Sequence, residues 1–151
     1  MATQRPTPYT NFNFLVDLSD GLATQSFGGF SEVSGLNTEI TVAEYRSGND
    51  AVNHVRKVPG VHKTGDVTLK RGVMGTQNLY NWIDSVRTGD LDLAKRTVTI
   101  TLLSEKREPV MTWKLINAMP LKWTGPQLSA KGGTDVAIEE FVLSVEAIEQ
   151  A

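Results

Sequence analysis

The sequence predicts a mainly β protein: an antiparallel β-sandwich or partly closed β-barrel of about seven strands, with one flanking α-helix at roughly 77–88. Several short segments alternate apolar and polar residues, as half-buried strands do. Only one segment has apolar residues at helical spacing. A long segment, 46–63, has neither period, and we interpret it as an arm that contacts another subunit. The 151 residues are expected to form one domain, 1–151, from which this arm extends.

Four strands are predicted in the N-terminal half. Apolar and polar residues alternate in them, as they do when one face of a strand is buried. The first is followed by the turn signal Asp20-Gly21. Gly28-Gly29 in the second suggests a β-bulge or a close backbone approach. These four strands cover 12–18, 26–34, 38–45 and 66–71.

One helix is predicted at 77–88. Thr76 is a residue type that favours the N-cap. Arg87 lies in the predicted last turn, and Gly89 is placed where helices commonly stop. A single apolar stripe results from the spacing of Leu79, Trp82, Ile83 and Val86. We expect Trp82 and Ile83 to be buried on this stripe.

Two strands are predicted directly after the helix. In 97–103, the aliphatic residues Val98, Ile100 and Leu102 alternate with threonines, which is a clear strand pattern. A longer strand begins at Met111 and runs toward Trp123. Pro120 interrupts its backbone donors, so it should lie at a sheet edge or at a bulge. A connection rich in turn residues then covers 123–131.

The last predicted strand contains a change of phase. Val136 and Ile138 are in one phase, while the later apolar residues are in the other. The change falls at Glu139-Glu140 and predicts a β-bulge there. The residues in the second phase are Phe141, Leu143, Val145 and Ala147.

The predicted arm combines charged, apolar, proline and glycine residues. It contains Gly48, Pro59 and Gly60, and its composition differs from that of a Gly/Ser linker. Segments of this length without secondary structure are uncommon in compact domains and are usually functional or disordered. We therefore expect the arm to become ordered against another protein surface, which favours an assembling subunit over an enzyme.

Composition excludes several classes of protein. Hydrophobic residues make up 40% and charged residues 21%, which is typical of a globular domain. The net charge of −2 argues against a generally basic nucleic-acid binder. The absence of cysteine excludes disulfides and thiolate metal sites. No signal-peptide pattern and no membrane-spanning run is visible, so we expect cytoplasmic synthesis, no membrane insertion by the chain, and release by lysis or within a particle.

Charges are segregated along the chain. Residues 46–71 carry six Lys or Arg against two acids, whereas 132–151 carry five acids and no Lys or Arg. One explanation is that the fold places these blocks side by side, so that they neutralise each other within a subunit. The other is that they attract each other between copies, which would favour register and association rate. On this second explanation, Glu139 and Glu140 would contact the arm of a neighbouring copy.

No catalytic residue, cofactor or metal site is predicted. His54 and His62 both lie in the arm, at a spacing that fits no metal motif. The tetrapeptide 72–75 matches the clamp of KH domains but lacks their βααβ context. The basic residues of the arm could contact phosphates, but no aromatic residue is interleaved with them to stack on bases.

Several motifs, taken in order, resemble the tail-tube proteins of contractile-tailed phages and of phage-like contractile injection systems. Each motif is weak alone, and the ordered set covers nearly the whole chain. One local departure is Met119, where an aromatic residue would be expected before the proline. The motifs are FLVDL at 14–18, GFSEVSGL at 29–36, EYR at 44–46, HVRKVPG at 54–60, VTLKRG at 67–72, Leu79 with Trp82, Trp113, NAMP at 117–120, KWTGP at 122–126 and VAIEEF at 136–141.

The resemblance implies a β-barrel subunit of the inner tube. Six copies would form a ring, and stacked rings would form a hollow conduit for DNA or protein cargo within a contractile sheath. Baseplate and terminator proteins would be further partners. By analogy with the family, the arm contacts the neighbouring subunit and the next ring, through the positions Arg46, His54, Val55, Arg56, Lys57 and Val58.

Two alternatives remain open at this point. A tube-initiator subunit at the baseplate would share the fold and would cap one end of the tube. An unrelated monomeric β-barrel that binds a ligand or carbohydrate would also match the composition.

Overall fold

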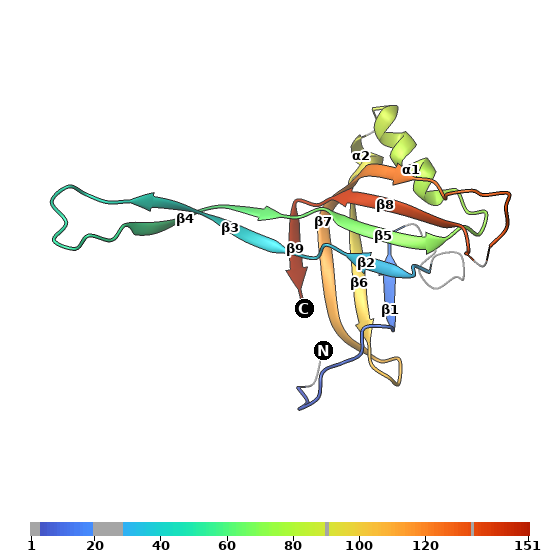
Figure 1. Ribbon diagram of the computed structural model, residues 1–151, viewed down its shortest axis with the longest axis horizontal. Helices are drawn as coiled ribbons and strands as arrows, with labels where there is room; N and C mark the ends of the chain where they lie inside the picture. Colours follow the sequence, from blue (N-terminus) through green and yellow to red (C-terminus); the bar gives the residue numbers. More distant parts are fainter. Residues whose placement is uncertain (1–3, 20–28, 90, 134) are drawn as a thin grey trace.

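The structure is a computed structural model, and it describes residues 4–19, 29–89, 91–133 and 135–151. Its elements form a compact body and one long projection (Figure 1). In chain order they are β1 (Phe14–Asp17), β2 (Glu32–Ser34), β3 (Thr38–Tyr45), β4 (Arg56–Thr64), β5 (Val67–Gly72), α1 (Asn78–Arg87), α2 (Leu91–Ala94), β6 (Arg96–Leu103), β7 (Pro109–Thr124), β8 (Ile138–Ser144) and β9 (Ala147–Gln150).

The body is built from two groups of antiparallel strands that share β7. The strand order is β1-β6-β7-β8-β5-β2, and β9 also pairs with β7. The first half of β7 pairs with β6 on one side and with β9 on the other, whereas its second half pairs with β8. In Figure 1 the two groups of strands run in crossing directions, with α1 and α2 at one end of the body. This agrees with the predicted mainly β fold.

The change of partner along β7 occurs at Asn117. This residue has a φ of 52°, a left-handed conformation that asparagine tolerates better than most residues. The pairing with β8 begins at Met119 and shifts register between Pro120 and Lys122. Strands that pass from one sheet to another bend at such bulges. The prediction that Pro120 lies at a bulge is confirmed.

The core lies between the sheets and under α1. Leu69 of β5 is directly opposite Phe141 of β8, and Val67 is opposite Leu143; all four are fully buried. Burying a side chain of this size stabilises the fold by about 1.5–3 kcal/mol. The buried cluster consists of Val16, Leu18, Val67, Leu69, Leu79, Trp82, Val98, Ile100, Leu115, Ala118, Phe141, Leu143 and Val145.

Helix α1 largely matches its prediction. Leu79 and Trp82 are buried, and Ile83 is partly buried against the core. Gly89 has a φ of 85° and donates its N–H to the carbonyl of Val86 at 3.0 Å, as expected for the helix stop. The predicted N-cap was wrong, because Gln77 occupies that position without a side-chain capping bond.

A short second helix, α2, was not predicted. Its carbonyl at Ala94 accepts a hydrogen bond from Nε1 of Trp82 at 2.6 Å. The Trp82 ring also packs against Phe141, with ring centroids 5.5 Å apart. The guanidinium of Arg96 lies over it, 4.7 Å from the ring centroid. Trp82 therefore joins both helices to the sheet.

The predicted bulge at Glu139-Glu140 was wrong. Strand β8 pairs with β5 in continuous register from Ile138 to Leu143. Glu139 points inward in phase with Phe141 and Leu143, and it is itself buried. The apparent change of phase arises because an inward position holds a glutamate and the outward position before it holds an isoleucine. The chain then breaks at Val145 and begins β9, where a single longer strand was expected.

The remaining strand predictions agree with the structure within a few residues. The strand at 38–45 has the predicted bounds, the one at 66–71 is displaced by one residue, and the one at 97–103 begins one residue earlier than predicted. The predicted strand at 26–34 lies partly outside the described residues, and its described part contains β2. The turn at Asp20-Gly21 lies outside the described residues.

Candidate subunit interface

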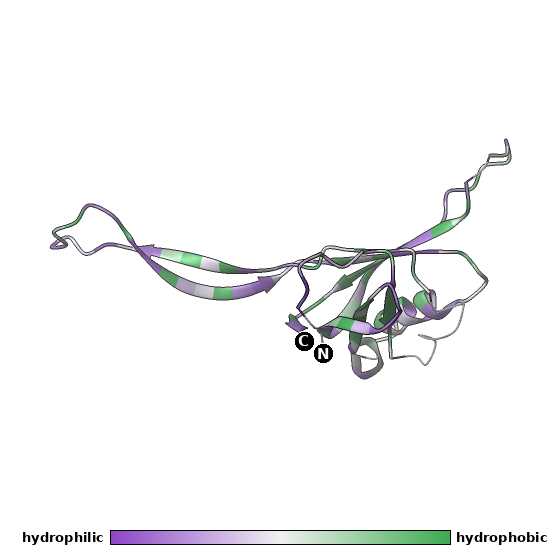
Figure 2. Cartoon of the chain, turned by 90° about the horizontal axis from the view of Figure 1, so that it is seen from below, coloured by the Kyte–Doolittle hydropathy of each residue, from purple (hydrophilic) through white to green (hydrophobic). Residues whose placement is uncertain are grey.

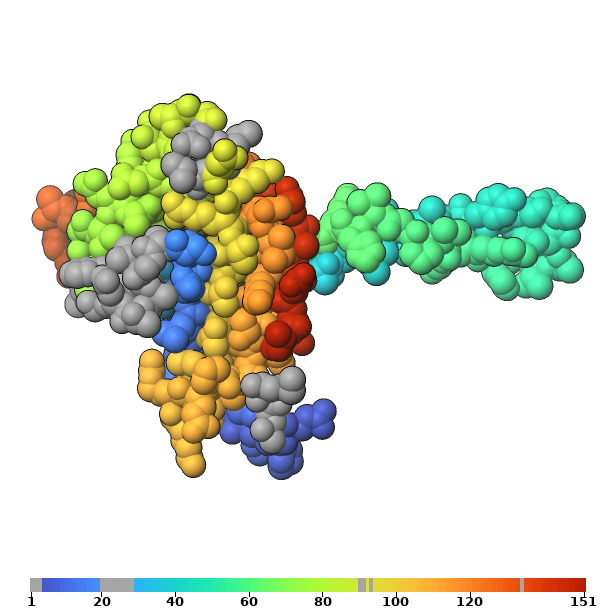
Figure 3. All heavy atoms as spheres, turned by 180° about the vertical axis from the view of Figure 1, so that it is seen from behind, coloured from blue at the N-terminus to red at the C-terminus, as the bar shows by residue number. Residues whose placement is uncertain are grey.

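Strands β3 and β4 form a two-stranded antiparallel hairpin that leaves the body. Among the described residues they pair only with each other, from Thr38 opposite Thr64 to Tyr45 opposite Arg56. Every residue of β3 is exposed, and so is every residue of β4 except Thr64. Figure 3 shows this hairpin standing clear of the body. An isolated two-stranded hairpin is marginally stable at best in water. Packing against the surface of another protein would stabilise this one.

The prediction of one irregular arm at 46–63 was therefore wrong for its second half, which is strand β4. The cause is a β-bulge at Gly60 and Val61, where the register shifts between Ile40 and Val42. The bulge interrupts the alternation that would have marked a strand. At Gly60 an added Cβ would lie 2.7 Å from the carbonyl oxygen of Thr41, so the close approach of the two strands requires glycine there. The projection is a hairpin over 38–64 with a loop over 46–55.

Both faces of the hairpin carry exposed apolar side chains. Residues that pair across two strands share a face. Face A holds Ile40, Val42 and Pro59, and face B holds Ala43, Tyr45 and Val58. Figure 2 shows hydrophobic and hydrophilic residues mixed along both strands. Ile40, Val42, Tyr45 and Val58 are 52%, 49%, 58% and 48% exposed. Both faces are exposed in the described structure, so each face could contact another protein.

The charges of the hairpin nearly cancel. Glu44 lies opposite Lys57, and Glu39 lies opposite Lys63. Three acids face four Lys or Arg over 38–64, so the basic character that 46–63 shows alone is offset by β3. Cross-strand opposite charges stabilise a hairpin slightly. The arm therefore presents exposed apolar residues and a nearly balanced charge, rather than a basic surface.

The tip of the hairpin is held by Asp50 and Arg46. The backbone N–H of Ser47 donates to Oδ2 of Asp50 at 3.0 Å, and Arg56 Nη2 lies 3.4 Å from Oδ1 of the same carboxylate. The Arg46 guanidinium donates to the backbone carbonyl oxygens of Asp50 and Val52 at 3.2 and 3.3 Å. These contacts all lie within residues 46–56, and they fix the conformation of the tip loop.

The base of the hairpin is fixed to the body. Oδ1 of Asn37 accepts a hydrogen bond from the N–H of Gly65 at 2.7 Å, and the Thr64 hydroxyl donates to the carbonyl of Val145 at 2.5 Å. An added Cβ at Gly65 would meet the Asn37 side chain at 2.4 Å. The direction in which the hairpin leaves is therefore set by specific contacts at its base.

The predicted arm positions fall at the outer end of the hairpin. Arg46, His54 and Val55 lie in the tip loop. Arg56, Lys57 and Val58 begin β4. Sequence reasoning missed the apolar residues contributed by β3, Ile40, Val42 and Tyr45, because it read β3 as a strand of the body. The alternation of β3 was visible, but nothing in the sequence indicates that both of its faces stay exposed.

The two predicted acidic positions lie in different environments. Glu139 is buried, and its Oε1 accepts a hydrogen bond from Nε of Arg71 at 2.6 Å. Its Oε2 accepts a bond from Nε1 of Trp123 at 3.2 Å. Its carboxylate is thus already engaged within the subunit. Glu140 points outward and lies opposite Lys70. Contact of either residue with the arm of another copy stays a prediction.

Other acidic residues of the C-terminal block also meet basic residues of their own subunit. Oε1 of Glu146 lies 3.3 Å from Nζ of Lys95, and Glu149 pairs in register with Lys114. Hydrogen bonds from Asn117 and Lys95 lower the pKa of Glu146 below its usual value. The segregated charge blocks are thus placed side by side within one chain, which supports the first of the two explanations.

A family model described as "T4-like virus tail tube protein gp19" matches residues 10–149. The chain belongs to this family. The match covers nearly all of the described structure, including the hairpin. The resemblance inferred from the ordered motifs is confirmed, and the hypothesis of an unrelated monomeric β-barrel is set aside. No curated protein matches the sequence.

Solved structures of related assemblies agree with the family. A chain from the sheath-tube complex of the extracellular contractile injection system PVC in its extended state is 30% identical, with a TM-score of 0.81, over 97% of this chain and 93% of that chain. A chain from the PVC sheath/tube terminator in its extended state is also 30% identical, with a TM-score of 0.80, over 99% of each chain. A chain from the anti-feeding prophage tube terminating cap is 27% identical, with a TM-score of 0.80, over 100% of this chain and 94% of that chain.

More distant structures share the fold alone. Hcp1 from Flavobacterium johnsoniae is 13% identical, with a TM-score of 0.52, over 91% of this chain and 94% of that chain. Within the part of the chain that the structure describes, no helix is long and apolar enough to cross a membrane. Among the same residues, no group of three or more His, Cys, Asp or Glu side chains could hold a metal ion.

Proposed function

We propose that this member of the tail tube family is the inner-tube subunit of a contractile phage tail or of a phage-like contractile injection system. Six copies form a ring, and stacked rings form a hollow conduit for DNA or protein cargo. The role is structural and passive, and no catalytic step is assigned to the chain. The single observation that carries the assembly is the hairpin, because it presents apolar side chains on both faces and has no cover from its own subunit.

The hairpin projects from one side of the body only, and a ring built through it requires a heterologous contact with another copy. Contacts of this type close into rings when the rotation between copies closes, and otherwise give helical filaments. We place Arg46, His54, Val55, Arg56, Lys57 and Val58 in this interface, together with the β3 residues Ile40, Val42 and Tyr45. Burying the apolar members between copies would provide most of the association free energy.

The similar structures suggest the partners. They come from a sheath-tube complex, a tube terminator, a tube terminating cap and a baseplate. We propose that this chain likewise contacts sheath subunits, a terminator and a baseplate, and that it is made in the cytoplasm before it enters the particle. Cargo would occupy the lumen.

A tube-initiator at the baseplate is the second candidate function. The observation in its favour is the similarity to a chain from the anti-feeding prophage baseplate, 27% identical with a TM-score of 0.78 over 97% of each chain. The two candidates differ in copy number, because a main tube subunit is present in many rings and an initiator in few.

Electron microscopy of the purified chain tests the proposal. Hollow tubes of stacked six-membered rings are expected as the protein concentration rises. Single rings that do not stack, together with a low copy number in purified particles, would favour the initiator. Monomers at all concentrations and salt conditions would contradict both candidates.

A further inference from the structure

Strands β8 and β9 are separated by a break at Val145 and Glu146, beside the point where the hairpin leaves the body (Figure 1). The Val145 side chain is buried, and its backbone carbonyl accepts a hydrogen bond from the Thr64 hydroxyl at 2.5 Å. Thr64 is the last residue of β4 and the one residue of that strand that is not exposed. The break is therefore a point at which the hairpin is attached to the body.

The break is held in place by the corner of β7. The backbone N–H of Glu146 donates to the carbonyl of Ile116 at 3.1 Å. Oε2 of Glu146 accepts a hydrogen bond from Nδ2 of Asn117 at 2.8 Å, and its Oε1 lies 3.3 Å from Nζ of Lys95. The ion pair with Lys95 is exposed and contributes little alone, so the two bonds to β7 matter most. We call these three contacts the Glu146 clamp.

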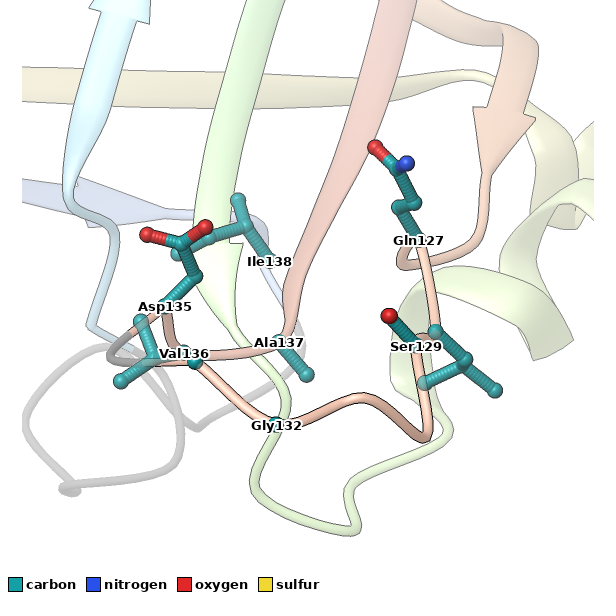
Figure 4. A pocket seen from close by; sticks show the side chains of 9 residues that line it. Gln127, Ser129, Gly132, Asp135, Val136, Ala137 and Ile138 are labelled. Carbon is teal, nitrogen blue, oxygen red and sulfur yellow. The ribbon is translucent and has the colours of Figure 1, made fainter.

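Strand β8 connects the break to the far end of the body. It begins at Ile138, which lines a groove of about 670 Å³ between the two limbs of the β7–β8 connection (Figure 4). From there β8 pairs with β5 on one side and with β7 on the other. Phe141 and Leu143 anchor it in the core, where both are fully buried. Because packed cores deform little, the Val145 carbonyl at the end of β8 is a fixed point.

The other attachments of the hairpin leave its angle free. The chain enters the hairpin from β2 through 35–37 and leaves it toward β5 through 65–66. The hydrogen bond from the N–H of Gly65 to Oδ1 of Asn37 joins these two connections to each other. Two connections of this kind allow rotation about the line between them, as at a hinge. A contact with a third element is needed to fix the angle, and the Thr64–Val145 bond supplies one.

We propose that the β8–β9 break positions the hairpin: the Glu146 clamp holds the Val145 carbonyl where the Thr64 hydroxyl bonds to it, and this bond fixes the angle at which the hairpin leaves the body. Thr64 and Glu146 are positioning residues in this scheme. The inference concerns the shape of the free subunit and goes beyond the proposed function, because it applies whether or not the subunits form a tube.

Distances between two spin labels test the proposal in the unassembled subunit. The chain has no native cysteine, so labels can be attached at chosen positions. Gly48→Cys labels the tip loop, where an added Cβ has no atom within 4 Å. Lys106→Cys labels the exposed turn between β6 and β7. Double electron–electron resonance on the dilute protein should give one narrow distance distribution when Thr64 and Glu146 are intact.

Substitutions of Thr64 test the bond itself. Thr64→Val keeps the branched shape of the side chain but removes the hydroxyl. It should broaden the distance distribution about twofold, because the hairpin can then rotate about its two connections. Thr64→Ser keeps the hydroxyl and should restore the narrow distribution. A Thr64→Val subunit with an unchanged distribution would overturn the proposal.

Substitutions of two acidic residues test the clamp. Glu146→Ala should broaden the distribution as Thr64→Val does. Glu149→Ala is the matched control, because Glu149 is an acid of β9 that pairs with Lys114 outside the clamp, and its distribution should stay narrow. If Glu146→Ala lowers the melting temperature but leaves the distribution narrow, Glu146 only stabilises the fold and the proposal fails. Equal broadening by both variants would also contradict it.

The outcome is separate from that of the proposed function. Tube formation by the wild type is scored by electron microscopy, whereas the label distances are measured on subunits that have not assembled. A wild type that forms no tubes would contradict the proposed function and leave the positioning of the hairpin intact.

Discussion

Nε of Arg71 donates a hydrogen bond to Oε1 of Glu139 across the β5–β8 pair at 2.6 Å, and the two side chains are only 3% and 9% exposed. Arg71 Nη2 also donates to the carbonyl of Thr76 at 3.3 Å, just before α1. Trp123 of β7 donates to the other carboxylate oxygen. The pair thus connects three strands to the start of the helix.

Removing one partner of this pair should be costly. Glu139→Ala leaves the buried Arg71 guanidinium without its carboxylate, and breaking such a pair typically costs about 3–5 kcal/mol. Urea unfolding of the monomer measures the loss. Glu140→Ala is the matched control, because Glu140 is adjacent but points outward, and it should cost less than about 1 kcal/mol. Equal losses for the two variants would contradict the proposed importance of the buried pair.

The same pair explains why the last strand was mispredicted. Sequence patterns assign glutamate to the outward face of a strand. Glu139 faces inward, so its position was interpreted as a bulge in the strand. Its partner Arg71 lies 68 positions earlier in the chain. A single sequence does not show that two such distant charges meet in the core. The prediction of the strand itself survived, because Phe141 and Leu143 keep the alternation that their burial requires.

Trp82→Ala should destabilise the monomer by about 3–5 kcal/mol, because the side chain is 1% exposed and its removal leaves a large cavity. Trp82→Phe keeps most of the packing but leaves the buried Ala94 carbonyl without its 2.6 Å donor, which costs about 1–3 kcal/mol. Thermal and urea unfolding can rank the three proteins. A phenylalanine variant as unstable as the alanine variant would show that the hydrogen bond, not the packing, dominates.

Local signals were enough to predict most of the body. The stripe of Leu79 and Trp82 and the stop at Gly89 define α1 without any distant contact, and the threonine alternation defines β6. The hairpin is different, because its second strand contains a bulge at Gly60-Val61 and its first strand is regular. Whether a regular strand joins the body or leaves it depends on pairing with distant strands.

Glu146→Gln should make the melting temperature fall less steeply as the pH is lowered from 7 to 3. Hydrogen bonds from Asn117 and then Lys95 hold the pKa of Glu146 below its usual value of 4.5 in the folded state. The ionised carboxylate therefore contributes stability above about pH 4.5, and this contribution is lost as the pH falls through the folded-state pKa. Melting temperatures of wild type and variant, measured from pH 7 to pH 3, should differ most at pH 7 and converge at pH 3. A constant difference at all pH values would rule out this linkage.

Replacing 39–63 by a two-residue Asn-Gly turn should abolish tubes without unfolding the body. Thr38 and Thr64 are paired in register at the base, so a short turn can close the two strands there. The removed residues bury almost nothing within the subunit, and the melting temperature should change by only a few degrees. Circular dichroism and electron microscopy give the two readouts. Tubes of normal appearance from this variant would contradict the assignment of the hairpin to the subunit interface.

Two glycines of the hairpin allow a sharper test of its shape. At Gly60 an added Cβ would lie 2.7 Å from the Thr41 carbonyl oxygen, whereas at Gly48 no atom lies within 4 Å. Gly60→Ala should therefore force β3 and β4 apart at the bulge and change the course of the hairpin. Gly48→Ala should leave it unchanged.

Because the hairpin is exposed in the subunit, neither substitution should lower the melting temperature of the body by more than a degree or two. The assembly rate should separate them, since a heterologous contact repeats at every subunit and a misdirected hairpin prevents closure of the ring. We expect Gly60→Ala to assemble at least tenfold more slowly than wild type, and Gly48→Ala to assemble normally, as measured by light scattering. Equal rates for the two variants would mean that the bulge does not direct the hairpin toward its partner.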